Sequence, residues 1–119
     1  MQNIFAITDG DTALMTAIEH GYVKIAEMLL EAKADPNIGK KSTTENSPLM
    51  LAAKYGHVEI VKSLVKNGAK VNYKDEEEQT ALKVAKHEKE AGNGGQHMKE
   101  IVNFLEEARM NSKIGALID

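Results

Sequence analysis

Apolar residues near the middle of the chain recur with the spacing of an α-helix. Leu49, Ala52 and Ala53 fall at positions i, i+3 and i+4, which places them on one helical face. A second set with helical spacing follows Gly56 and comprises Ile60, Val61, Leu64 and Val65. The pattern predicts two short antiparallel helices within residues 47–72, each with one apolar stripe. A single pair of this size is marginal by itself, so it needs similar pairs on both sides.

The predicted helices have recognisable start and stop signals. Ser47 can accept a hydrogen bond from the free N–H groups that begin a helix, and Pro48 suits the first helical position. Gly56 stands where a left-handed residue would end the first helix, and Asn67-Gly68 would end the second. The boundaries therefore agree with the apolar pattern.

Two further stretches, Asp9–Asn37 and Thr80–Ala108, repeat this organisation. Leu14, Leu49 and Leu82 are equivalent positions, separated by 35 and 33 residues. A fixed period in this range is typical of proteins built from stacked helical repeats. In the first copy the second helix is expected to turn four residues inward: Ile25, Ala26, Leu29 and Leu30.

The chain resembles the ankyrin repeat family over residues 9–108. The segments that carry the resemblance are Thr12-Ala13-Leu14, Ser47-Pro48-Leu49, Thr80-Ala81-Leu82, Ala52-Ala53 with Gly56-His57, Ile60-Val61 with Leu64-Val65, Gly68-Ala69 with Asn72, and Ala34-Asp35-Pro36-Asn37. The resemblance implies an all-α fold, an ankyrin-repeat solenoid of stacked antiparallel helix pairs with short β-hairpin loops that project from the stack. His57 has a structural role in the family's Gly-His step.

The resemblance also divides the chain into segments. They are an N-terminal arm (1–8), an ankyrin repeat domain (9–109) with repeats at about 9–41, 42–74 and 75–109, and a C-terminal tail without a clear pattern (110–119). The arm is read either as a strand-like extension or as the edge of an earlier repeat, so the chain is either a whole small protein or a fragment.

The third repeat contains an insertion near residues 86–96. Leu82 and Ile101 are 19 residues apart, whereas the equivalent Leu49 and Ile60 are 11 apart. We expect a longer first helix, to about Ala91, then a flexible glycine loop and a second helix from about residue 96. The loop, Gly92–Gly95, is interpreted as a surface insertion, with a partner-contacting finger as the alternative.

Several positions depart from the repeat pattern. Thr16 and Glu106 are polar at normally apolar sites, which favours capping repeats at the two ends. Lys33 is equivalent to Gly68 and should adopt the left-handed region, at a cost of about 1 kcal/mol. Glu45 and Glu78 replace the glycine of the family's hairpin turn, so both tips should be irregular.

Composition excludes several functional classes. The sequence has no cysteine, which excludes disulfides and a thiol nucleophile. Its net charge is −3 with acids and bases well mixed, so no basic field attracts nucleic acid. No apolar run reaches the ~18 residues of a membrane span. The first eight residues lack the basic and apolar regions of a signal peptide.

No constellation of a catalytic or metal site is evident, and we predict no enzyme activity and no cofactor. His87 lacks a second histidine four residues later, and His97 is interpreted, like His87, as solvated. Gly92–Gly95 lacks the strand and the Lys-Ser/Thr pair of a phosphate loop. The acidic run 75–78 lacks the alternating ligands of a calcium loop.

Two further sets of residues are read as structural. The lysines Lys83, Lys86 and Lys89 share one helical face and are interpreted as balancing neighbouring acids. Met15 and Met50 follow the equivalent leucines, and core packing is favoured over an adaptable contact role.

The resemblance implies a non-catalytic protein–protein interaction module, an adaptor or scaffold. It would bind another protein through the concave face of the first helices and the hairpin tips. The predicted partner-binding residues form three columns: Glu19, Lys54 and His87; His20, Tyr55 and Glu88; and Asp11, Asn46 and Gln79. Tyr55 is the expected anchor, with a ring packed on its own repeat as the alternative.

The sequence also leaves other functions open. The domain is expected to be a cytoplasmic monomer with no nucleic-acid or membrane partner, and an effector secreted into a host cytoplasm is included in that expectation. One alternative is a targeting segment of a larger enzyme or bacterial effector. The other is a structural or self-association module.

Overall fold

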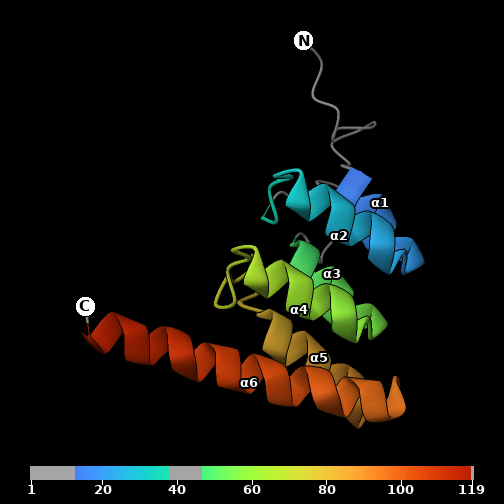
Figure 1. Cartoon of the computed structure of the whole chain (residues 1–119). Helices are drawn as coiled ribbons and strands as arrows, with labels where there is room; N and C mark the ends of the chain where they lie inside the picture. Colours follow the sequence, from blue (N-terminus) through green and yellow to red (C-terminus); the bar gives the residue numbers. More distant parts are fainter. Residues whose placement is uncertain (1–12, 38–46, 119) are drawn as a thin grey trace.

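The computed structural model describes residues 13–37 and 47–118, with side chains as far as residue 111. The described residues form six α-helices and contain no strand (Figure 1). The helices are α1 (Ala13–His20), α2 (Val23–Glu31), α3 (Pro48–Tyr55), α4 (Val58–Lys66), α5 (Ala81–Glu90) and α6 (Gly95–Ile118). The predicted all-α class is confirmed.

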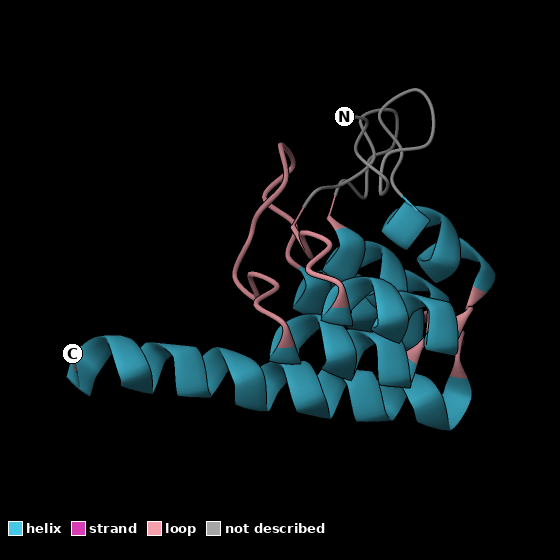
Figure 2. Ribbon diagram, turned by 45° about the horizontal axis from the view of Figure 1, so that its top comes forward, coloured by secondary structure: helices cyan, strands magenta, loops and turns pink. Residues whose placement is uncertain are grey.

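The helices stack as three antiparallel pairs in two layers (Figure 1). One layer contains α1, α3 and α5, in which each helix packs on the next, and α2, α4 and α6 form the other layer. The described loop residues between pairs, 32–37 and 67–80, leave the stack on one side (Figure 2). This arrangement is the predicted ankyrin-repeat solenoid.

Capping residues begin and end the helices of the second repeat, with Ser47 and Gly56 in their predicted roles. The Ser47 hydroxyl accepts a hydrogen bond from the backbone N–H of Met50 at 3.4 Å, and Thr80 caps α5 in the same way through Lys83 at 3.2 Å. Gly56 ends α3 with φ of 75°. Thr12, which by its equivalence to Ser47 was expected to cap the first helix, lies outside the described residues.

Gly21 is required by two independent constraints. Its φ of 71° lies in the left-handed region, and a Cβ atom there would lie 2.8 Å from the His57 ring. The imidazole of His57 therefore fills the space beside the α1–α2 turn, which agrees with the structural role that the resemblance implies for it.

The apolar stripes of all three pairs meet in one continuous core. Leu14, Leu49 and Leu82 are buried in it at equivalent positions. Met15 and Met50 are almost completely buried beside them. This confirms that the two methionines pack in the core.

The prediction that Ile25 faces the core is wrong, because its side chain is 48% exposed. The equivalent Ile60 is fully buried. Ser63, on the same side of α4, donates a hydrogen bond to a carboxylate oxygen of Glu27 at 3.4 Å, so this side of α4 faces α2. No described helix packs on the corresponding side of α2, and the burial of this position therefore depends on a preceding repeat.

Hydrogen bonds, and no strands, join the described parts of the loops between pairs. Asn37 links the first two repeats, since its amide donates to the Gly68 carbonyl at 3.2 Å and accepts from the Lys70 N–H at 2.9 Å. In the next loop the Asp75 carboxylate accepts from the N–H groups of Glu77 and Gln79, both at 2.9 Å. The hairpin expected there is a turn, and residues 38–46, which carry the preceding one, lie outside the described part of the chain.

The tip of the loop that precedes α5 is irregular, as predicted. Glu78 has φ of 65°, a left-handed conformation that glycine adopts far more easily. The corresponding prediction for Glu45 falls outside the described residues.

Lys33 has the left-handed conformation expected from its alignment with Gly68. Its φ is 73°, and its side chain is exposed. We predict that Lys33→Gly will stabilise the fold by up to about 1 kcal/mol, because glycine removes the strain of a Cβ atom at positive φ. Chemical denaturation measures the change, with Lys66→Gly as a control that should destabilise the regular helix α4. Destabilisation by Lys33→Gly would contradict the predicted strain.

The third repeat contains the predicted insertion between α5 and α6. Helix α5 has ten residues, two more than α1 or α3, and α6 begins at Gly95. Met98 is buried and packs beside Gly94, where a Cβ atom would lie 3.0 Å from its side chain. The mobility of the glycine loop stays a prediction.

The prediction of a patternless tail after residue 109 is wrong, because α6 continues to Ile118 and extends beyond the stack (Figures 1 and 2). The first two repeats end their second helices at left-handed residues, Lys33 and Gly68. The equivalent residue in the third repeat is Arg109, which lies within α6. Without a left-handed stop or a proline, the helix continues.

Candidate protein-binding surface

Two of the three predicted partner-binding columns lie on the layer that contains α1, α3 and α5. Because α1, α3 and α5 pack side by side, equivalent positions on them are brought into rows. His20 and Tyr55 are the last residues of α1 and α3, and Glu88 lies two residues before the end of α5. The row Glu19, Lys54 and His87 is one residue earlier on each helix. We refer to these six residues as the helix-end surface.

Tyr55 has the largest side chain of the helix-end surface and is 49% exposed. Its ring centroid lies 6.1 Å from that of His57, and the two rings are tilted by 58°. One part of the ring therefore contacts its own repeat, while the other part is open to solvent. This geometry holds the ring in place without hiding it, which suits an interface anchor.

His57 contacts Tyr55 through a tilted pair of rings. It is partly buried, and this burial lowers the pKa of its imidazole below the usual value. Desolvation favours the neutral form of the imidazole, which agrees with its packing beside Gly21 and Tyr55.

Residues of the first repeat extend the aromatic character of the surface. The His20 ring stacks on Tyr22, with centroids 5.3 Å apart and planes 20° apart, and its Nδ1 lies 2.9 Å from the Thr16 carbonyl oxygen. Tyr22 is 51% exposed and was missed by sequence reasoning. The sequence did contain a signal for it. Tyr22 is equivalent to His57, and a tyrosine at this position departs from the family's Gly-His step.

The third repeat connects the surface to the insertion. Glu88 accepts a hydrogen bond from the side-chain amide of Asn93 at 2.9 Å, while His87 is exposed. The inserted loop is thus tied to the edge of the helix-end surface through one side-chain contact.

Of the third predicted column, only Gln79 lies within the described residues. Gln79 is half-buried, and its backbone bonds to Asp75, with the N–H of Asp75 donating to the Gln79 carbonyl at 3.0 Å. Asp11 and Asn46 lie outside the described residues. The structure therefore brings together six of the nine predicted residues and positions a seventh in the turn before α5.

The described part of the chain holds no group of three or more histidine, aspartate or glutamate side chains that could bind a metal ion. Within the same residues, no helix is both long and apolar enough to cross a bilayer.

Comparisons with known proteins agree with the fold. A family model described as ankyrin repeats in three copies matches residues 34–114, and a single ankyrin repeat model matches residues 9–41. Similar curated proteins include the Drosophila melanogaster "Ankyrin repeat and KH domain-containing protein mask", which is 40% identical over 64 residues, or 54% of this chain. The Arabidopsis thaliana "E3 ubiquitin-protein ligase XBAT33" is 42% identical over 84 residues, or 69% of this chain. The chain spans 2% of the first relative and 16% of the second.

Proposed function

This chain belongs to the ankyrin repeat family, and from that premise we propose that it binds a partner protein through the helix-end surface and the adjoining loops. Ankyrin repeats are generally non-catalytic protein–protein interaction modules, so the proposal adds the surface and the mode of binding. The partner would lie across the ends of α1, α3 and α5. The concave face predicted for the family corresponds to this layer.

The observation that carries the proposal is the half-exposed Tyr55 at the centre of a rigid row. Tyr55 lies between His20 and Glu88 on helices that pack directly against one another. Because the stack holds these side chains in place before binding, little conformational entropy is lost when a partner docks. The mixed charges of Glu19 and Lys54 would adjust specificity and association rate more than affinity.

We further propose that the module acts in the cytoplasm as a monomer and does not bind nucleic acid. The mixed surface charge and net charge of −3 give no strong attraction to nucleic acid.

A second candidate function, a targeting segment of a larger protein, is favoured by one observation: the similar proteins are many times longer than the chain. Under that proposal the binding surface is the same, and any catalysis belongs to other domains.

An affinity pull-down tests the proposed surface. The intact domain is compared with a variant carrying Lys54→Ala, Tyr55→Ala and His87→Ala, and with a control carrying Glu59→Ala, Lys62→Ala and Lys66→Ala on the exposed side of α4. We expect the first variant to lose the partner while the control retains it. Equal recovery by both variants would contradict the surface, and a concentration-dependent mass without any foreign partner would favour the self-association alternative.

A further inference from the structure

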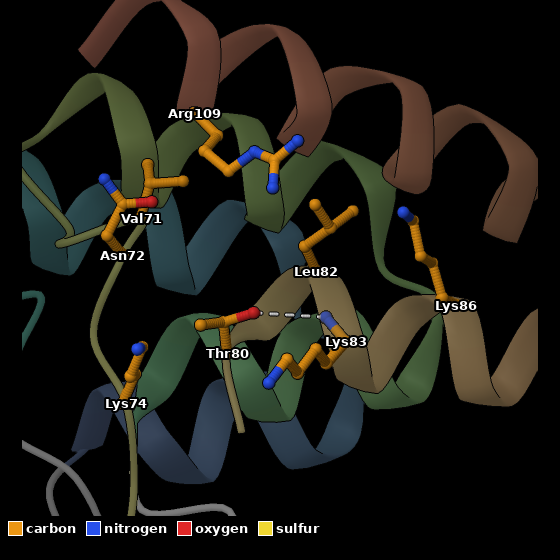
Figure 3. A pocket seen from close by; sticks show the side chains of 8 residues that line it. All are labelled: Val71, Asn72, Lys74, Thr80, Leu82, Lys83, Lys86 and Arg109. Carbon is orange, nitrogen blue, oxygen red and sulfur yellow. Dashed lines mark hydrogen bonds between the residues drawn. The ribbon is translucent and has the colours of Figure 1, made fainter. Parts of the chain in front are cut away.

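A cavity of about 430 Å³ opens at the C-terminal end of the stack, away from the helix-end surface. It is lined by Val71, Asn72, Lys74, Thr80, Leu82, Lys83, Lys86 and Arg109, which come from α5, α6 and the loop between α4 and α5 (Figure 3). Four of these side chains are cationic. No acidic side chain is found among the described residues that line it. We call this cavity the basic pocket.

The repeat register shows that these charges replace core residues. Lys83 is equivalent to Met15 and Met50, and Lys86 is equivalent to Ile18 and Ala53. All four apolar counterparts are buried, whereas both lysines are exposed. The first two repeats have a following repeat packed on them, but the third has none among the described residues. At these two positions the end of the stack therefore presents cations. The first two repeats, which are each covered by a following repeat, have apolar groups there.

Contacts within the described part of the chain neutralise only part of the positive charge of the basic pocket. Lys74 pairs with the exposed Glu78 carboxylate at 3.5 Å, and the Lys83 ammonium donates to the Glu78 backbone carbonyl at 3.1 Å. The Nε atom of Arg109 is buried and has no hydrogen-bond acceptor. A buried donor without an acceptor is unfavourable, and several cations around one cavity repel each other. A bound anion would relieve the repulsion among the cations, and it would contact Arg109 through the terminal nitrogens of its guanidinium, because the buried Nε is out of reach.

We propose that the basic pocket binds a carboxylate side chain from an acidic segment of a partner protein. The guanidinium of Arg109 can hold a carboxylate through two parallel hydrogen bonds, and Lys86 adds a second positive charge. Val71 and Leu82 supply apolar walls for the methylene groups of a glutamate side chain. The ligand class rests on the proposed function, because the acidic segment is assigned to a protein.

The surrounding charges favour a short acidic peptide over a long polyanion. Residues 75–78 are all acidic and continue the loop that contributes Lys74 to the basic pocket. A nucleic acid or an anionic membrane would extend across these carboxylates and meet repulsion. A single carboxylate side chain that enters the cavity avoids most of that repulsion. The arrangement of charges therefore favours a short acidic segment over a long polyanion.

Binding of a labelled poly-glutamate peptide to the full chain tests the proposal, with a poly-glutamine peptide of equal length as the uncharged probe. Fluorescence polarisation at about 0.15 M salt limits long-range attraction. We expect Lys86→Glu to weaken poly-glutamate binding about tenfold or more, which corresponds to about 1.4 kcal/mol. The matched control Lys62→Glu makes the same charge change on α4 and should weaken binding less than about twofold, because surface charges far from a site are screened.

Three outcomes would overturn the basic pocket as the site. They are equal losses in Lys86→Glu and Lys62→Glu, no preference for poly-glutamate over poly-glutamine, and tighter binding of a single-stranded oligothymidylate than of the peptide. Arg109→Gln tests the guanidinium separately, and thermal melts confirm that each variant is folded. Tyr55→Ala distinguishes the two proposals. If it weakens poly-glutamate binding as much as Lys86→Glu does, the peptide binds at the helix-end surface. That result would overturn the basic pocket as the site but support the proposed function.

Discussion

Replacing Leu49 with alanine is expected to destabilise the fold by about 2–5 kcal/mol. Leu49 is 1% exposed in α3, the only described helix of its layer with a neighbour on each side, α1 and α5. Truncation removes apolar contacts and leaves a cavity that the surrounding close-packed side chains fill only in part.

The effect of Leu49→Ala is measured by urea denaturation monitored by circular dichroism. Leu29→Ala is the matched control, since the same change is made at a half-buried position in the first repeat. We expect a clearly smaller loss for Leu29→Ala, and an unchanged denaturant slope would show that both variants still unfold in one transition. A loss below about 1 kcal/mol for Leu49→Ala would contradict its central place in the core.

Replacing Tyr55 with alanine is expected to weaken partner binding by about 1–3 kcal/mol while leaving the melting temperature nearly unchanged. The ring is half-exposed and makes one tilted contact with His57, so its removal costs the folded domain little. In a complex, a partner would enclose the exposed half of the ring and remove it from water. Large aromatic anchors of this kind carry much of the binding energy of an interface.

Isothermal titration with the partner recovered in the pull-down measures the loss. Met28→Ala is the control, because Met28 is an exposed apolar side chain (64%) on α2, in the other layer of the stack. Tyr55→Phe separates the contribution of the hydroxyl from that of the ring. Unaltered binding by a folded Tyr55→Ala variant would move the proposed interface to the loop tips or to the inserted glycine loop.

Features that depend on neighbours in the sequence were predicted closely. The cap Ser47, the left-handed Gly56 and the left-handed Lys33 all have the predicted geometry. Each of these depends on hydrogen bonds and steric limits within one turn of the chain, which residue type largely decides. The repeat spacing then places the helix pairs in a stack, because each pair must bury its apolar stripe against another.

Predictions of the binding surface were limited for a different reason. Equivalence between repeats was enough to place His20, Tyr55 and Glu88 in one row, since it needs only the period of the sequence. The stacking of His20 on Tyr22 and the contact between Tyr55 and His57 depend on side-chain orientation. No spacing rule contains that information, so Tyr22 was missed.

The sequence by itself determined the helix pairs, their caps and their order in a three-repeat stack, because these follow from local periodicity and backbone preference. Only the tertiary structure decided which equivalent positions are buried. Ile25 and Ile60 share one repeat position but differ in exposure, and Ala53 and Lys86 share another. Burial in a solenoid is a property of the interface between repeats, so a residue at either end loses the neighbour that would cover it.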